Sequence, residues 1–257
     1  MTQSRYINFI FETQGAVSPE QEEIAREAFS AAGTTLETEW RVLTPITINV
    51  CLMSDTAFRD GAAPTDPTSW RYCFLLRDQT ENSTRIYCNV DIFQTLPQDA
   101  AAMITHETAH AVVGVLVGDI TAYKKSFFFE EGTAGLEQAT NRLIAKLRQD
   151  PTQSIPNPLT LKTIADIRTL GGDTNKEPFT EQLGYLALFS AAAFLRDRHG
   201  EGKIIETYRR LGSEHSLEDA YQAVCKESLK NALTEWRATI QQALLSRNEI
   251  STPETAQ

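Results

Sequence analysis

The pattern of apolar and polar positions divides the chain into a strand-rich first part and a helical second part. Runs rich in β-branched and aromatic residues predict strands at 6–11, 46–53, 71–76 and 84–93. After the first of these, Ser18, Pro19 and Gln21 form the start of a capping box, and apolar residues then recur at helical spacing. The first part therefore predicts a mixed sheet packed with a helix.

Helical periodicity replaces the strand pattern from Thr95 onward. Thr95 and Gln98, with Pro97 between them, fit a second capping box, and the helix it opens runs to about Gly118. Another helix begins near Glu131 and is followed by a proline-rich break. Further helices are expected at about 159–170, 180–199, 201–211, 216–225 and 228–246.

Strands followed by helices predict the α+β class. We expect an N-terminal α+β part over residues 1–118, a helical part over 119–250 and a polar tail over 251–257. No internal repeat interrupts this organisation. At 257 residues, the chain is long enough to bury a substantial core as one large domain or two small ones.

The composition limits the classes of partner. Apolar residues make up 41% of the chain and charged residues 23%, which is typical of a soluble globular protein. The net charge of −10 argues against nucleic acid and against an anionic membrane surface. The N-terminus lacks the pattern of a signal peptide, so we expect a cytoplasmic protein, or a secreted one if a leader has been removed.

The four cysteines show no spacing typical of a zinc knuckle. Cys73 and Cys88 fall in runs that predict strands, where both a buried free thiol and a disulfide between the two are compatible with the sequence. The pairing stays open at this point.

Residues 103–112 read MITHETAHAV and place two of the four histidines four residues apart. On a helix, His106 and His110 share one face and can present both imidazoles to one ion, while Glu107 points to the side. Such a run can also occur by accident on an exposed helix. Here the flanks are apolar on every side, so we expect a buried helix, interrupted by too many polar groups to be a membrane span. Buried imidazoles need partners, and a zinc ion provides them.

A catalytic zinc site requires a third protein ligand. The candidates lie in SFFFEEGTAGLEQAT (126–140), where three phenylalanines precede Glu130 and Glu131. An apolar lead-in suggests that these acids are buried at a helix start, where a cation would stabilise them. The alternative is a pair of acids favoured there by the helix dipole alone. His199 and His215 are expected at the surface or at helix C-termini and not as ligands.

With HETAH and EEGTAGLE together, the chain resembles the gluzincins, zinc peptidases of the peptidase MA-like group. The resemblance covers about residues 84–240 and implies a zincin-like fold with Zn²⁺ held by His106, His110 and Glu131, Glu130 being the alternative to Glu131. It implies Glu107 as general base and then general acid. It also implies Tyr185 as an oxyanion-stabilising residue, although a core tyrosine fits the pattern equally well.

The resemblance has departures. Position 135 is glycine where several gluzincins carry an acid that orients the first histidine, so Glu137 is the candidate for that role. No G-x-M-E-N element is present, which favours an endopeptidase over an aminopeptidase. In this fold an edge strand near the site normally pairs with the extended substrate. The run at 84–93 is the candidate. A plain core strand also fits this run, and the two interpretations are compatible.

The sequence therefore predicts a zinc-dependent endopeptidase acting on a protein or peptide. Two other functions remain open: a zinc-scaffolded binding protein without turnover, and a zinc hydrolase acting on bonds other than peptides. The intact Glu107 argues against the first, because a purely structural zinc site does not need a base.

Overall fold

The computed structural model of the chain describes residues 4–62, 73–78, 83–118, 139–161, 183–214 and 216–246. The chain divides into two compact units. The first contains the described residues up to 118 together with 208–214, and the second contains the rest. The chain passes from one unit to the other within helix α10 (Glu201–Leu211).

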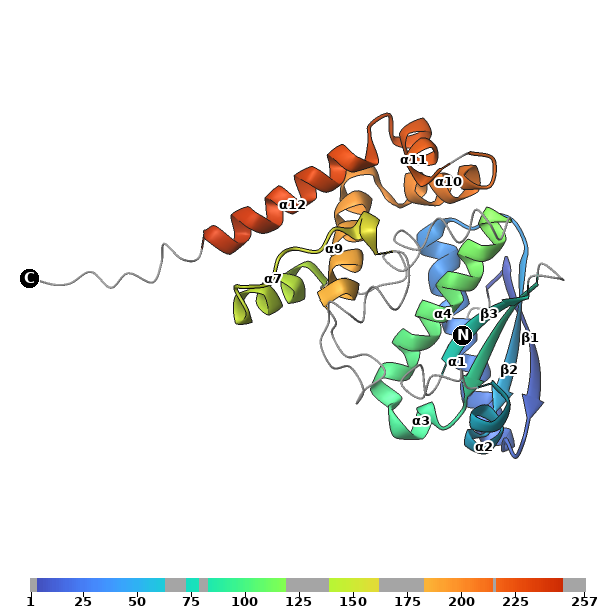
Figure 1. Cartoon of the computed structure of the whole chain (residues 1–257). Coiled ribbons are helices and arrows are strands. Elements are labelled where there is room, and N and C mark those ends of the chain that lie inside the picture. The colour runs from blue at the N-terminus through green and yellow to red at the C-terminus, as the bar shows by residue number, and fades with distance from the viewer. Residues whose placement is uncertain are drawn as a thin grey trace, which may run out of the picture. The chain divides into compact units, whose positions relative to one another are not determined.

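The first unit is built on a mixed sheet, shown in Figure 1. Its strands are β1 (Ile7–Gln14), β2 (Ile46–Met53), β3 (Cys73–Asp78) and β4 (Ser83–Asn89), in the spatial order β1-β2-β4-β3. The first two strands and β4 run parallel, whereas β3 is antiparallel to β4. With helices following these strands, the molecule is of the mixed α+β class, as the sequence predicts.

Strand β4 lies between β2 and β3 and therefore has no free edge. The prediction that the run at 84–93 offers an edge to a substrate is therefore wrong, and β4 is a core strand, which the sequence also allowed. The run is also shorter as a strand than predicted. Asn89 Oδ1 accepts a hydrogen bond from the Asp91 amide at 3.1 Å, which turns the chain into the short helix α3 (Ile92–Thr95).

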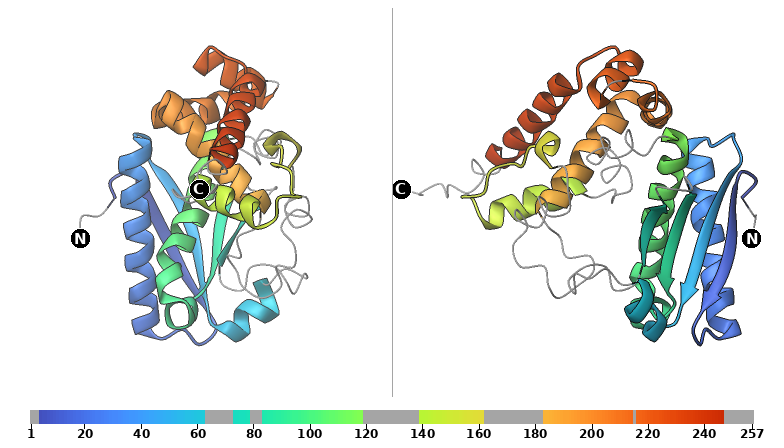
Figure 2. Two further views of the ribbon diagram at one scale, coloured as in Figure 1. Left: turned by 90° about the vertical axis from the view of Figure 1, so that its left-hand side faces the viewer. Right: turned by 45° about the vertical axis from the view of Figure 1, so that its right-hand side comes forward.

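Two helices, α1 (Pro19–Trp40) and α4 (Pro97–Val117), cover one face of the sheet side by side, as both views of Figure 2 show. Alternate residues of β2 that face them are fully buried, as are matching residues of β4: Ile46, Ile48, Val50, Leu52, Ile86 and Cys88. The opposite face carries polar pairs such as Arg85 Nη1 with Glu12 Oε1, 2.8 Å apart. The core of this unit therefore lies between the sheet and the two helices.

One end of the opposite sheet face is also covered. The short helix α2 (Asp55–Ala57) leads into a π-helical turn, η1 (Phe58–Ala62). Phe58 packs there against Cys51 and Met53, and all three are buried.

The start of α1 follows its predicted capping box. Ser18 Oγ accepts the Gln21 amide at 3.2 Å, and Gln21 Oε1 accepts the Ser18 amide at 3.0 Å. The box predicted for α4 does not form. Thr95 belongs to α3 and donates its hydroxyl to the Asp91 carbonyl at 2.8 Å, so the N-cap of α4 is Leu96, which provides no side-chain cap.

The second unit is helical. Its described elements are α7 (Ala139–Gln149), the 3-10 turn η2 (Pro158–Thr160), α9 (Leu183–His199), α11 (Leu217–Cys225) and α12 (Leu229–Leu245). Helices α9 to α12 match the predicted ranges within three residues, and Gly200 ends α9 with a φ of +81°, as glycine readily does. The predicted helix start near Glu131 and most of the predicted helix 159–170 lie outside the described residues.

Helices α7, α9 and α12 pack on one another around three side chains joined by buried polar contacts. Ser190 on α9 accepts the indole N–H of Trp236 at 3.0 Å, and its oxygen lies 2.9 Å from the Thr140 hydroxyl. Ser190 is fully buried and Trp236 is 1% exposed. A residue from each helix thus meets at this point, which fixes how the three helices fit together within the unit.

Candidate metal centre

The middle of α4 carries the sequence HETAH. The helix is continuous from Pro97 to Val117 and ends at Gly118, whose φ of 71° suits glycine and whose N–H bonds the Gly114 carbonyl at 3.2 Å. An unbroken helix places His106 and His110 one turn apart on one face, as their spacing predicts.

The two imidazoles converge. His106 Nε2 and His110 Nε2 lie 2.9 Å apart, and the rings stand nearly perpendicular, with an interplanar angle of 88° and centroids 4.5 Å apart. At this separation one Nε2–H can donate to the lone pair of the other. The same arrangement brings one ring nitrogen of each histidine to the same place, and chelation of a single cation by the pair requires that proximity.

The predicted burial of this helix holds for most of its length but not for all of its polar residues. Ile104, Ala111 and Val112 are fully buried, and His110 is 7% exposed. His106 and Glu107 are only half-buried, so the polar residues lie where the buried face of α4 meets a more accessible one. Water and substrate must reach a catalytic site, and full burial of all three residues would prevent that.

The threonine inside the motif is satisfied by the helix. Thr108 is fully buried and donates its hydroxyl to the Ile104 carbonyl at 2.7 Å. Thr105 makes the equivalent bond to the Ala101 carbonyl at 2.8 Å. These hydroxyls are engaged with the backbone of α4, as threonine commonly is within helices.

The remaining predicted site residues stand as follows. Glu131 and its alternative Glu130 lie outside the described residues, as does Glu137. Tyr185 is on α9 in the second unit, half-buried, with its ring centroid 5.7 Å from that of Phe189. The structure thus brings together His106 and His110, with Glu107 on the same helix.

Within the described residues, no three histidine, cysteine, aspartate or glutamate side chains form a group that could hold a metal. Within the same described residues, His106 and His110 are a candidate pair of ligands.

Helix α4 is also long and apolar enough, between Asp99 and Val117, to cross a membrane by length and composition alone. However, 67% of that window is buried inside the protein. Core helices of soluble proteins pass the same test, so this is weak evidence for a membrane span.

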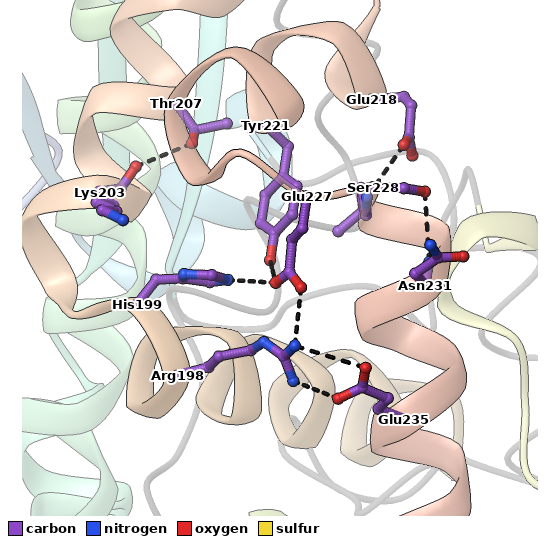
Figure 3. A network of polar contacts seen from close by, with 11 residues as sticks. Arg198, His199, Lys203, Thr207, Glu218, Tyr221, Glu227, Ser228, Asn231 and Glu235 are labelled. Atoms are coloured by element: carbon purple, nitrogen blue, oxygen red, sulfur yellow. Dashed lines mark hydrogen bonds and ion pairs between the residues drawn. The ribbon is translucent and has the colours of Figure 1, made fainter.

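A second polar cluster lies in the second unit, and Figure 3 shows it from close by. Glu227, in the corner between α11 and α12, receives contacts from three directions. Its Oε1 lies 2.5 Å from His199 Nε2 and accepts the Tyr221 hydroxyl at 3.2 Å, and its Oε2 accepts Arg198 at 2.8 Å. Arg198 also bonds Glu235 on α12. The cluster ties the end of α9 to the corner.

The contacts within this cluster shift the pKa values of two of its residues, Glu227 and Tyr221. Burial raises the pKa of Glu227, but the hydrogen bonds from His199, Arg198 and Tyr221 outweigh burial, so its pKa lies below the ordinary value. Burial is also the main reason that the pKa of Tyr221 is raised, so its phenol stays protonated. Paired side chains that all belong to one corner are typical of a structural contact, and we assign the cluster no catalytic role.

The sequence predicts that His199 lies near a helix C-terminus, and it does. The sequence does not predict the partner of His199. Glu227 is 28 residues further on, between two helices, and no local pattern links the two positions. His215 lies outside the described residues.

Comparisons with known proteins add no assignment. No protein-family model matches the chain, and neither a curated protein nor a solved structure matches it.

Proposed function

We propose that the protein is a zinc-dependent endopeptidase of the gluzincin type, in which His106, His110 and Glu131 hold the metal. The observation that carries the proposal is the convergence of the two Nε2 atoms, 2.9 Å apart, from successive turns of α4. A hydrogen bond between the two rings gives the same short distance, so the metal is supported by this convergence together with Glu107, one residue beyond His106 on the same helix.

The donor set fits zinc. Two nitrogens bound to one tetrahedral zinc ion at about 2.0–2.1 Å lie about 3.3 Å apart. The separation of 2.9 Å is therefore shorter by a few tenths of an ångström, which a small rotation of either ring would open. Neutral imidazole nitrogens combined with a carboxylate are ligands that zinc accepts in catalytic sites.

Bound zinc supplies Lewis acidity, which polarises a peptide carbonyl and makes water a stronger acid. In the proposed reaction the Glu107 carboxylate accepts a proton from the attacking water and delivers it to the departing amine. Glu107 is one residue beyond His106 on α4 and is half-buried, so it is beside the ligands without being one of them. Tyr185 is proposed to donate its hydroxyl to the oxyanion of the tetrahedral intermediate.

The substrate is proposed to pair with β3 instead of β4. Helix α4 packs against both strands, but only β3 is at an edge of the described sheet. The edge of a sheet presents unpaired backbone donors and acceptors, to which an extended peptide adds as a further strand. This mode of binding reads the peptide backbone along its length and suits cleavage within a chain.

The decisive experiment measures metal content and hydrolysis on the same preparations. Elemental mass spectrometry of the purified wild-type protein is expected to find one zinc ion per chain. The same preparation should cleave an unfolded protein such as reduced casein, and the chelator 1,10-phenanthroline should abolish this cleavage. The Glu107→Gln variant should retain zinc and lose activity by about 100-fold or more, because general-base catalysis typically contributes that much. His106→Ala should lose both.

Two controls isolate these effects. Glu39→Gln removes an exposed carboxylate on α1 and should leave zinc and cleavage unchanged. His199→Gln removes a histidine outside α4 and should leave the zinc content unchanged. If the wild-type protein contained no zinc after dialysis against a zinc-containing buffer, the metal site would be refuted. Zinc bound without cleavage of any peptide would instead favour the binding protein.

A further inference from the structure

The pairing of β3 with β4 places two of the four cysteines opposite each other. In this antiparallel register Cys73 is the direct partner of Cys88. Directly opposed residues of antiparallel strands have Cα atoms about 4.5 Å apart at non-hydrogen-bonded positions and about 5.5 Å apart at hydrogen-bonded ones. Both separations fall within the range of about 4.4–6.8 Å at which a disulfide can close. The sequence alone left this pairing open, and the register favours it.

The position of the pair within the hairpin determines what a covalent bond between the two cysteines would restrain. The described pairs run from Asp78 with Ser83, next to the connection between the strands, to Cys73 with Cys88 at the open end. The connection already restrains one end of β3. The other end is remote from that connection, and within the described sheet β3 pairs on one side only, so a covalent bond there adds a restraint that the connection does not supply.

Neither of the other two cysteines is opposite this pair in the described sheet. Cys51 on β2 is in register with Tyr87, so it faces the side of the sheet opposite to Cys88, because neighbouring residues of a strand alternate between faces. Burial and the neighbouring Glu12 carboxylate raise the pKa of the Cys51 thiol to about 11, which leaves little reactive thiolate at neutral pH. Cys225 is in the second unit.

We propose that Cys73 and Cys88 form a reversible disulfide that fastens the open end of the edge strand β3 to β4 under oxidising conditions. Cys88 is fully buried and its thiol is free in this structure. The inference does not depend on zinc or on hydrolysis, since it follows from strand register alone.

The oxidant we propose is a hydroperoxide, with hydrogen peroxide as the probe. One cysteine thiolate attacks the peroxide oxygen and becomes a sulfenic acid, releasing hydroxide, which takes a proton to become water. The thiolate of the second cysteine attacks the sulfenic sulfur, forming the S–S bond and releasing a second water after protonation. In total, two thiols and one peroxide give one disulfide and two waters. A dithiol reductant reverses the reaction.

Peptide mapping tests the pairing. The reduced full-length chain is treated with equimolar hydrogen peroxide, alkylated, and digested without reductant. We expect a linked peptide that joins Cys73 to Cys88, loses two hydrogens in mass, and separates in dithiothreitol. Cys51→Ser/Cys225→Ser, which leaves only the proposed pair of thiols, should form the same link, and Cys73→Ser should not. A link involving Cys51 or Cys225, a dimer, or alkylation of both thiols after peroxide treatment would overturn the proposal.

Hydrogen exchange tests the consequence for β3. Oxidation of Cys51→Ser/Cys225→Ser should slow amide exchange in the peptide that covers 73–78 by about tenfold or more, because the tether opposes local opening of the strand. The peptide that covers β1, the other edge of the sheet, should exchange as before. Unchanged exchange in β3 upon full disulfide formation would overturn the proposed fastening. Because Cys88 is buried and its replacement risks misfolding, Cys73→Ser is the variant that reports the loss.

Discussion

Gly212 lies against the C-terminal end of the candidate metal helix: a methyl group in place of its hydrogen would be 2.5 Å from the Val117 carbonyl oxygen. No side-chain carbon in a folded protein approaches a backbone oxygen so closely. Residue 212 belongs to the segment 208–214, which is far from α4 in sequence but part of the same compact unit. The absence of a side chain at this position is what allows the segment to pack on the end of α4.

Gly212→Ala should therefore destabilise the protein. The atom that the new methyl group meets is backbone and cannot rotate away, so either α4 or the 208–214 segment must shift. Overpacking of this kind costs about 1–3 kcal/mol. Urea denaturation measures the loss, with Gly202→Ala on α10 as the matched control. A methyl group at Gly202 meets nothing within 4 Å, so this change should be neutral or add up to about 1 kcal/mol. Equal stability of the two variants would contradict the close contact.

The proposed zinc site predicts that removal of zinc lowers the thermal stability of the wild-type protein. A ligand that binds only the folded state stabilises it by mass action, by about 2.7 kcal/mol at a free concentration 100 times its dissociation constant. We expect a chelator to lower Tm and added zinc to restore it. In His106→Ala, neither treatment should change Tm, since a single imidazole from this helix does not hold the ion. A shift of the same size in that variant would show that zinc acts elsewhere.

Glu227 should make stability depend on pH in the acid range. Its pKa is lowered in the folded state, so the carboxylate contributes stability above the ordinary value of 4.5 and loses that contribution as pH falls through the lower folded value. Glu227→Gln removes the charge that His199 and Arg198 contact. Near pH 7 it should reduce the free energy of unfolding by about 1.5–3 kcal/mol, as expected for hydrogen bonds to a charged group.

The difference between wild type and Glu227→Gln should shrink as pH is lowered below 4.5, because the wild-type carboxyl then becomes neutral as well. Denaturant titrations over this range measure it. Glu39→Gln, an exposed change on α1, should follow the wild-type curve throughout. A gap between wild type and Glu227→Gln that widens with acidification would have the wrong sign for the cluster we describe.

Ser190→Ala should destabilise the helical unit by leaving the buried indole N–H of Trp236 without its acceptor. An unsatisfied buried donor costs about 1–3 kcal/mol. Trp236→Phe removes that donor, so in its background Ser190→Ala should cost less than in the wild type. A double-mutant cycle in urea measures the coupling of the two residues, which contact directly at 3.0 Å. Additive effects would mean that this hydrogen bond does not contribute to stability.

The sequence predicts best what is determined locally. The Ser18 capping box forms because its two partners are three residues apart, and the two imidazoles of α4 meet because helical geometry fixes their spacing. The capping box predicted at Thr95 does not form, because the chain turns after β4 and the Thr95 hydroxyl donates to the Asp91 carbonyl instead. Local patterns compete, and the outcome depends on where the preceding strand ends.

Non-local pairing could not be predicted. The interior position of β4 follows from β3 adding on its far side, and the opposition of Cys73 and Cys88 follows from the register of that hairpin. Neither is encoded in the alternation of residues within one strand, since the same alternation fits an edge or a central position. Glu227 was missed for the same reason, as its partners come from helices remote in sequence.

The corner between α11 and α12 has a consequence for any attempt to express the helical unit alone. Glu218 on α11 accepts the backbone N–H groups of Leu229 and Lys230, the first residues of α12, at 3.0 and 3.3 Å. A fragment that stopped after α11 would lose these donors and also the packing of Trp236 on Ser190. Limited digestion should accordingly leave the last two helices joined, and a soluble fragment needs to extend at least to Leu245.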